Sequence, residues 1–478
     1  MTHMLKNKTK KHMLTAFILT ASVIGSTVFT GNSAYAAAEA VQGKVTEVRT
    51  SNEAIAEWES WTKDHAYKLE SIQPADSKGG AGQFKDLDML KPLLHDKRIV
   101  FLGESSHGVR EFNLAKTRLI QFLHQEMGYN VLAFESGLGN ASLAYGKSGT
   151  QSAEQTMKDS IFGVWWAQET MPLFEYIKTT QKSEQPLALT GFDMQLQFPL
   201  LDGDWLKDDK LAQRLQEAEE KLSEYSAGTD LKAYQKEKAQ LIQVYKDVLK
   251  ATGSESSQAL LKELYPTNDK LPVLLERSLN DRISVAKEYV EISIKSNIGM
   301  GEGEYTWFLK SMELRDKAML DNLMWLATDV YPTEKFIVWA HNDHIRKAQS
   351  EVMGSPYPVK LMGEMLPDDM KKYSYVLGLY PASGETADNM GNPHDVLPLA
   401  SGSVESILSA SGSPYTFIDL RYRTNERGNS WMFEPRYTYS WGMIPESLVA
   451  RDQYDGILLI DDVKPPLYMR STSSKSVE

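Results

Sequence analysis

Short runs of consecutive apolar residues alternate along this chain with longer segments in which apolar residues recur every three or four positions. The first pattern is typical of strands buried on both faces of a sheet, and the second of helices packed on one face. Residues 109–127 have the helical period and end at Gly128, a residue type that commonly terminates helices. The alternation predicts an α/β fold class, a mostly parallel β-sheet flanked by helices. The predicted strands are residues 97–104, 130–137, 185–195, 335–343, 373–380, 415–420 and 456–462.

The pattern changes between the third and fourth predicted strands. Residues 210–225, 231–250 and 279–296 are rich in charge and have a helical period. They predict an α-helical insertion or subdomain at about 203–305. Its charged faces are best explained as solvated helix surfaces.

The N-terminal 1–36 segment has the pattern of a secretory signal peptide. Four lysines precede an apolar stretch, and Ala34 and Ala36 are the small residues that a signal peptidase accepts. Cleavage near Ala36 predicts a secreted, extracellular protein with no stable membrane association; the alternative is an uncleaved membrane anchor. The mature domain would be 37–478, and its Ser- and Lys-rich end, about 464–478, is predicted to be a frayed tail.

Composition narrows the possible functions. The 478 residues carry a formal charge of −12, which becomes about −16 once the four leader lysines are removed from the 52 basic residues. With no basic patch in the sequence, a nucleic-acid partner is not expected. The absence of cysteine excludes disulfides, a thiol nucleophile and thiolate metal ligands.

Acids and histidines lie at the ends of four of the predicted strands. In a parallel sheet the carboxyl ends of the strands share one edge, where ligands bind in a crevice. We therefore expect these side chains to converge on one functional site. They are Glu104 and His107 at the end of the first strand, Glu135 at the end of the second, Asp193 at the end of the third, and His341 and His344 at the end of the fourth.

Four segments also resemble, in the same order, motifs of the erythromycin esterase family. The resemblance covers essentially the whole mature chain, and four ordered motifs make it specific. The segments are LGESSHGVREFNLAKTRLIQFLHQEMGYNVLAFESG (102–137), GFDMQ (191–195), ELRDKAMLDNLMWL (313–326) and VWAHNDHI (338–345).

The resemblance implies that His107 is the general base on a water that cleaves an ester, with Glu104 and Glu135 as its carboxylates. The second histidine motif of the family matches His341 and His344. Some family members have an arginine at the position of Lys116, so the role of this lysine stays open. Family members differ in whether they cleave macrolides, so the fold and the site chemistry transfer better than the substrate.

The residue types support the same chemistry independently. Histidine has an unperturbed pKa near ~6.5, so a neutral imidazole is available at pH 7 to take a proton from water. A carboxylate such as Glu104 or Glu135 can orient that ring, and His341 or His344 can polarise the carbonyl, stabilise the oxyanion or protonate the leaving alcohol. The candidate substrate-binding residues are Lys116, Asp193, Trp165 and Trp166, the two tryptophans as the wall of an apolar cleft.

The two serines of GESSHG are not predicted to be nucleophiles. A nucleophile elbow has the pattern G-x-S-x-G, which this stretch does not match. A serine adjacent to a histidine in sequence is also poorly placed to hydrogen-bond its ring. We interpret Ser105 and Ser106 as turn or helix-capping residues.

Two alternatives to a water-attacking ester or lactone hydrolase remain. The same His and Glu residues are an acceptable ligand set for a divalent metal, so no cofactor is expected but a metal-dependent hydrolase is possible. The chain could also be an exported protein that binds a small molecule in the cleft without turnover. In the favoured interpretation the binding partner is a small-molecule ester or lactone substrate, and macrolides are included in this class.

Overall fold

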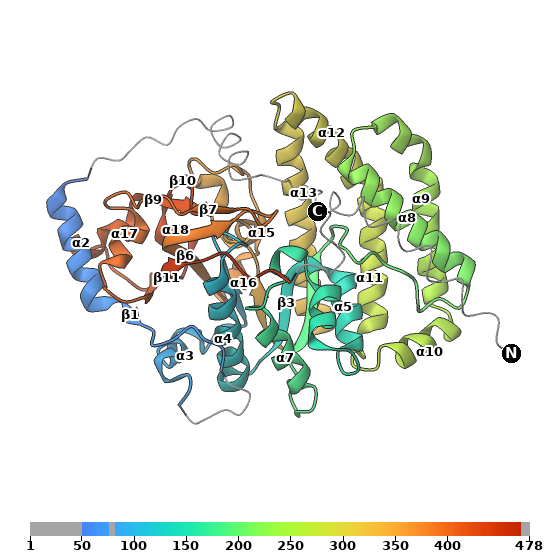
Figure 1. Ribbon diagram of the computed structural model, residues 1–478, viewed down its shortest axis with the longest axis horizontal. Helices are drawn as coiled ribbons and strands as arrows, with labels where there is room; N and C mark the ends of the chain where they lie inside the picture. The colour runs from blue at the N-terminus through green and yellow to red at the C-terminus, as the bar shows by residue number, and fades with distance from the viewer. Residues whose placement is uncertain (1–49, 76–81, 470–478) are drawn as a thin grey trace, which may run out of the picture.

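The computed structural model describes residues 50–75 and 82–469. The predicted signal peptide, and residues 470–478 of the predicted tail, lie outside the described residues. At the centre is a sheet with the order β1-β8-β11-β6-β2-β5-β3-β4, and β7 pairs with β6 (Figure 1). Its strands are β1 (Tyr67–Lys68), β2 (Ile99–Leu102), β3 (Tyr129–Gly137), β4 (Ala188–Asp193), β5 (Lys335–Trp339), β6 (Ser374–Ala387), β7 (Pro393–Asp395), β8 (Tyr415–Asp419) and β11 (Gly456–Val463).

The predicted α/β fold class is confirmed. The six strands from β11 to β4 in the sheet order are parallel. At one edge β8 is antiparallel to β11, and β1 is antiparallel to β8. All seven predicted strands are present. A hairpin of β9 (Pro435–Ser440) and β10 (Ile444–Val449) was not predicted, and it forms a separate two-stranded sheet.

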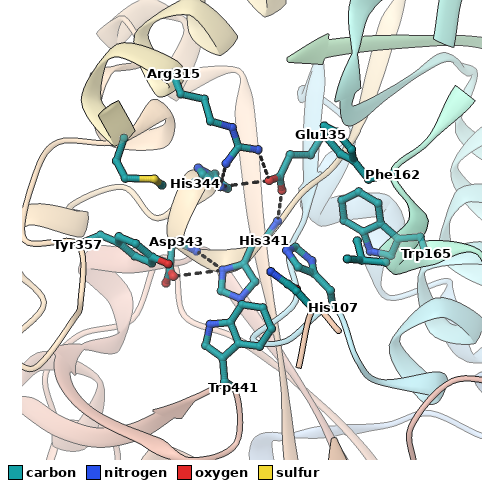
Figure 2. Close-up of a pocket in the computed structure, with 13 residues that line it drawn as sticks. His107, Glu135, Phe162, Trp165, Arg315, His341, Asp343, His344, Tyr357 and Trp441 are labelled. Carbon is teal, nitrogen blue, oxygen red and sulfur yellow. Dashed lines mark hydrogen bonds and ion pairs between the residues drawn. The ribbon is translucent and has the colours of Figure 1, made fainter. Parts of the chain in front are cut away.

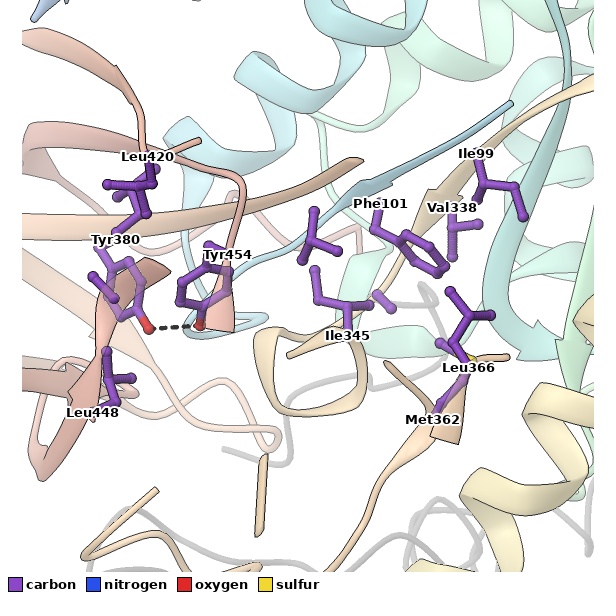
Figure 3. Packing of buried hydrophobic residues seen from close by; sticks show 14 of the residues in the cluster. Ile99, Phe101, Val338, Ile345, Met362, Leu366, Tyr380, Leu420, Leu448 and Tyr454 are labelled. Carbon is purple, nitrogen blue, oxygen red and sulfur yellow. Dashed lines mark hydrogen bonds between the residues drawn. The ribbon is translucent and has the colours of Figure 1, made fainter. Parts of the chain in front are cut away.

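The apolar runs predicted the central strands because both faces of the sheet are buried. Side chains alternate between the faces of a strand. In β2, Ile99 and Phe101 accordingly enter one hydrophobic cluster and Val100 and Leu102 the other. Figure 3 shows the first cluster, where Phe101 and Val338 pack near Ile345.

Helix α4 (Arg110–Met127) covers the sheet and ends where the sequence predicts. Gly128 follows it with φ 69°, the left-handed conformation that glycine adopts without steric cost. The helices that follow the other strands, or precede the first, are α2 (Asn52–His65), α3 (Leu90–Leu94), α5 (Leu138–Lys147), α6 (Ala153–Ser160), α7 (Met171–Thr180), α13 (Thr306–Trp325), α14 (Asn342–Ile345), α15 (Met362–Met365), α16 (Asp368–Lys372), α17 (Val404–Ser409) and α18 (Ala450–Gln453).

The segment predicted as a helical insertion forms helices beside the sheet, at the right of Figure 1. These helices bury a hydrophobic cluster of their own, with Leu215, Tyr245 and Leu279 at its centre. A separate core explains why their apolar positions keep a helical period. The helices are α8 (Asp209–Ala227), α9 (Leu231–Thr252), α10 (Glu255–Leu264), α11 (Leu271–Ser284) and α12 (Val290–Gly301).

The described part of the predicted tail is not frayed. Residues 464–469 run along the Trp166–Gln168 segment, where Met469 N donates to Trp166 O at 2.7 Å and Gln168 N donates to Leu467 O at 2.9 Å. The Ser- and Lys-rich part of the predicted tail, residues 471–478, lies outside the described residues, so the prediction stays open there. Within residues 50–75 and 82–469, no helix is long and apolar enough to cross a membrane.

Candidate active site

Three neighbouring parallel strands bring the candidate residues together. Leu102 of β2 lies beside Trp339 of β5, and Trp339 lies beside Phe134 of β3. The segments that leave the carboxyl ends of these strands therefore emerge side by side, as the sequence predicted. A register shift between β3 and β4 just after Phe134 locally bends β3 at Glu135.

Backbone contacts at this edge hold the three segments in register. The N–H of Asn342 donates to the carbonyl of Glu104 at 2.8 Å, and the N–H of His341 donates to Oε2 of Glu135 at 2.8 Å. Gly103 permits this close approach, because a Cβ there would lie 2.0 Å from Oδ1 of Asn342. Glu135 is thus fixed by β5 as well as by its own strand.

These segments surround a pocket whose empty space, including open solvent at its mouth, is about 670 Å³. Apolar and aromatic side chains surround a small set of ionisable groups (Figure 2). The lining residues are His107, Glu135, Phe162, Val164, Trp165, Met312, Arg315, His341, Asp343, His344, Tyr357, Asn389 and Trp441.

His107 rests on a buried carboxylate behind the pocket wall. Its Nδ1 lies 2.7 Å from Oε1 of Glu104, which also accepts a 2.8 Å hydrogen bond from Nε1 of Trp165. Nζ of Lys116 forms an ion pair with the other oxygen of Glu104 at 2.5 Å. Burial raises the pKa of Glu104, but Lys116 and His107 outweigh it, so that pKa is lower than usual and Glu104 is ionised.

These contacts determine which nitrogen of His107 carries its proton. Since an ionised carboxylate can only accept, Nδ1 must donate to Glu104, which leaves the lone pair of the neutral ring on Nε2. Nε2 has no hydrogen-bond partner among the described side chains and backbone groups, and the ring lines the pocket. Burial lowers the pKa of His107 although Glu104 opposes it, so the neutral form prevails at pH 7.

His344 is bound through both of its nitrogens. Nδ1 lies 2.8 Å from Oδ1 of Asp316, and Nε2 lies 3.1 Å from Oε1 of Glu135. Burial alone would lower the pKa of His344, but the carboxylates of Asp316 and Glu135 have the larger effect and raise it to about 10. This pKa favours an imidazolium whose Nδ1 donates to Asp316 and whose Nε2 forms an ion pair with Glu135. Nη1 of Arg315 also lies 3.2 Å from that Nε2.

Arg315 binds the remaining carboxylates beneath the pocket. Its Nη2 donates to Oε1 of Glu135 at 2.8 Å and to Oδ2 of Asp193 at 2.7 Å, and its Nε donates to the same Asp193 oxygen at 3.0 Å. Burial would lower the pKa of Arg315, but the carboxylates of Asp193 and Glu135 outweigh it and raise that pKa. Burial would raise the pKa of Glu135, but His344 and Arg315 outweigh it and hold that pKa well below its usual range. This part of the site is a paired ionic network.

His341 lies between the two other histidines. Its ring stacks on Trp441 with 5.1 Å between ring centroids and 24° between planes, and its centroid is 5.0 Å from that of His107. The backbone N–H of Asp343 donates to Nδ1 at 3.2 Å. Nε2 is buried without a hydrogen-bond partner in the described residues.

The structure separates the predicted site residues into two groups. His107, Glu135, His341, His344 and Trp165 line the pocket. Glu104 does not line it and acts on it through His107.

Three of the residues predicted to bind substrate do not line the pocket. Lys116 is fully buried against Glu104, and Asp193 is buried against Arg315. The indole of Trp166 donates to the carbonyl of Ile161 instead. For Lys116 and Asp193 the reason is charge: a buried ion is paired within the protein, so neither remains free for a ligand.

The predicted turn role fits Ser106 of GESSHG, whereas Oγ of Ser105 has no hydrogen-bond partner in the described residues. Both are fully buried and neither lines the pocket. Oγ of Ser106 accepts from the N–H of Gly108 at 3.2 Å, a local turn contact. Neither caps α4, whose N-cap residue is Val109.

Several pocket residues were missed, and one signal for them was present in the sequence. Arg315 and Asp316 lie three or four positions from both Met312 and Met319, so two charged residues occupy the buried face of α13. Charge on an apolar helix face indicates paired ions or a site. Trp441 comes from the hairpin turn between β9 and β10, and only long-range contacts bring it to the pocket.

The described residues contain no group of three or more His, Cys, Asp or Glu side chains arranged to hold a metal ion. Two of the proposed ligands, Glu135 and His344, are bound to each other and to Arg315. The guanidinium of Arg315 is itself a cation, and it lies where it would repel a metal ion bound to Glu135 and His344.

Comparison with known proteins gives consistent matches. The sequence pattern described as Erythromycin esterase matches residues 124–463, which contain Glu135, His341 and His344 but not Glu104 or His107. "Putative hydrolase YbfO" of Bacillus subtilis (strain 168) is 34% identical over 427 residues, covering 86% of this chain and 92% of that protein. Erythromycin esterase type II of Escherichia coli is 23% identical over 386 residues, covering 76% and 89%.

A solved structure shows the same fold. A mutant of the erythromycin esterase EreC in its open conformation superposes with a TM-score of 0.55 at 18% identity, covering 84% of this chain and 98% of that one.

Proposed function

Because the chain belongs to the erythromycin esterase family, we propose that it hydrolyses a small-molecule ester or lactone with a water molecule activated by His107. One observation carries the proposal. His107 is held by Glu104 through Nδ1 and offers an unpartnered Nε2 to the pocket. This is the arrangement of a general base whose tautomer is set by a carboxylate.

The reaction follows from that geometry. Nε2 of His107 takes a proton from water as the water oxygen bonds to the carbonyl carbon, and the carbonyl oxygen becomes an oxyanion. Collapse of this intermediate breaks the bond to the leaving oxygen, which receives the proton, so that one water is consumed per carboxylic acid and alcohol formed. Glu104 stabilises the imidazolium that exists between the two proton transfers. No covalent acyl-enzyme forms.

His341 is the partner of His107 in this proposal. Its Nε2 is the second unpartnered imidazole nitrogen in the pocket lining, whereas both nitrogens of His344 are engaged. His341 serves the oxyanion or the leaving oxygen, and His344 holds Glu135 in place. The rings of Trp165 and Trp441, with Phe162 and Tyr357, favour a substrate with an apolar body, and macrolide lactones are candidates in this class.

The test is a panel of esters and lactones, macrolides included, incubated with the purified protein and followed by mass spectrometry. We expect a product that has gained one water, activity that survives chelator treatment, and no acyl adduct in the intact protein mass during turnover. Binding of panel compounds without turnover would contradict the proposal in favour of a ligand-binding protein. Loss of turnover that returns with added metal ion would favour a metallohydrolase.

A further inference from the structure

The rings of His107 and His341 are neighbours in the pocket lining, but their Nδ1 atoms have opposite kinds of partner. Nδ1 of His107 lies against a carboxylate, which can only accept a proton. Nδ1 of His341 lies against the backbone N–H of Asp343, which can only donate, at 3.2 Å. A nitrogen that accepts from an N–H carries a lone pair, so the proton of His341 belongs on Nε2.

A second group competes for the same nitrogen. Oδ2 of Asp343 lies 3.2 Å from Nδ1 of His341, but its geometry is not that of a hydrogen bond. A free carboxylate at this distance would draw a proton onto Nδ1. Whether it does so depends on how far its charge is neutralised by other groups.

Arg346 is the cation paired with Asp343, and it also pairs with Glu446. It is fully buried, and its Nη1 lies 3.0 Å from Oδ1 of Asp343 as an ion pair. Four further contacts are hydrogen bonds, so its position is fixed. The other acceptors are Tyr454 at 2.7 Å, Gln349 at 3.1 Å, Tyr380 at 3.1 Å and Glu446 at 2.6 Å.

We propose that Arg346 is a positioning residue that pairs with Asp343 and so keeps the proton of His341 on Nε2. His341 is then a fixed hydrogen-bond donor toward the carbonyl oxygen, complementary to the base His107. This inference rests on the proposed function and adds the role of His341 and the residue that secures it. A neutral histidine held by a backbone N–H is a known way to polarise a carbonyl.

Nε2 has no hydrogen-bond partner in the described residues, and the ring of His341 lines the pocket. A buried N–H without a partner is energetically unfavourable. A substrate oxygen that accepts from it removes this cost, and an oxyanion accepts more strongly than a carbonyl. The donor is thereby matched to the charge that develops during the reaction.

The charged groups around His341 are compatible with a neutral ring. Glu135 is bound to its backbone N–H and is neutralised by Arg315 and His344. Glu446 of β10, the other carboxylate of this network, is bound to Arg346. His107, the nearest titratable ring, is neutral before water is deprotonated.

The test is ¹⁵N NMR of the full chain labelled at histidine, with the His341 signals identified by their loss in His341→Asn. We expect the wild type to show a ring protonated on Nε2, with the lone pair on Nδ1. In Arg346→Met the proton should move to Nδ1 or the ring should become an imidazolium, and kcat should fall at least ~10-fold with little change in KM. Adding Asp343→Asn to Arg346→Met should restore the Nε2–H form, since the backbone N–H remains.

Arg118→Met is the matched control, because Arg118 is another buried, ion-paired arginine but lies away from the pocket. It should lose stability without any change at His341. A wild-type ring protonated on Nδ1 would overturn the proposal without any variant having to fold. An unchanged tautomer in folded Arg346→Met would overturn the role of Arg346. Either result is distinct from failure of the proposed function, which depends on turnover and on His107.

Discussion

His107 and His344 both lie against buried carboxylates in one pocket, yet their second nitrogens differ. Nδ1 of His107 contacts Glu104, and its Nε2 is left to the pocket. His344 contacts Asp316 through Nδ1 and Glu135 through Nε2, and its pKa is raised to about 10. An imidazole can take up a proton only where a lone pair is free, so proximity to a carboxylate does not by itself identify a catalytic base. In the proposed function, His107 is accordingly the base and His344 holds Glu135 in place.

The largest expected effect comes from removing the free lone pair. In His107→Asn we expect kcat to fall about 10²–10⁴-fold, the usual contribution of general base catalysis. The side chain remains polar and of related shape, so circular dichroism and thermal unfolding should match those of the wild type. Near wild-type kcat in a folded variant would remove His107 from the mechanism and make His341 the next candidate base.

The charge of Glu104, the carboxylate that contacts His107, is paired with Lys116. Loss of Lys116 should have the next largest effect. Lys116→Met leaves Glu104 as a fully buried carboxylate without its cation, which typically destabilises a protein by about 3–5 kcal/mol. Lys116→Arg keeps the charge and should lose less of both stability and kcat. Denaturant unfolding and kcat should be measured for both variants. Equal stability of the methionine variant and the wild type would show that Glu104 does not need the ion pair.

His344, whose two nitrogens both have partners, should contribute to the free energy of unfolding in a pH-dependent way. The pKa of His344 in the folded protein, about 10, is above the ordinary value of 6.5. Its contribution should therefore be complete below about pH 6.5 and disappear as the pH rises through about 10. The difference in free energy of unfolding between the wild type and His344→Gln should shrink by more than ~1 kcal/mol from pH 6.5 to pH 10. A constant difference over this range would mean that His344 is not an imidazolium.

The smallest effect is expected at the serines. Ser105→Ala and Ser106→Ala should each keep kcat within about 3-fold of the wild type, because surrounding water, not a serine, is the proposed nucleophile. Any change should appear as a modest loss of stability in Ser106→Ala, which removes the contact with the N–H of Gly108. An acyl group found on either serine by peptide mass spectrometry would refute the water mechanism.

Much of this site could be predicted from the sequence because parallel strands share one edge. The apolar runs located β2, β3 and β5. At their shared edge, Glu135 near the end of β3 joins Glu104 and His341, which lie just beyond β2 and β5. Predictions that depended on where a side chain points were less successful. Trp166 is adjacent to Trp165, but its indole bonds to Ile161 and it does not line the pocket.

What the sequence by itself determined is the periodic part of the molecule: strands buried on both faces, helices such as α4 with its end at Gly128, and the strand ends at which ionisable residues occur. These features depend on neighbours along the chain. Only the tertiary structure decided which ring nitrogens remain without a partner, since Asp316 of α13 and Glu135 of β3 contact both nitrogens of His344. Contacts of about 3 Å between segments far apart in sequence cannot be inferred from neighbours along the chain. For that reason three histidines that look equivalent in the sequence have three different sets of partners in the pocket.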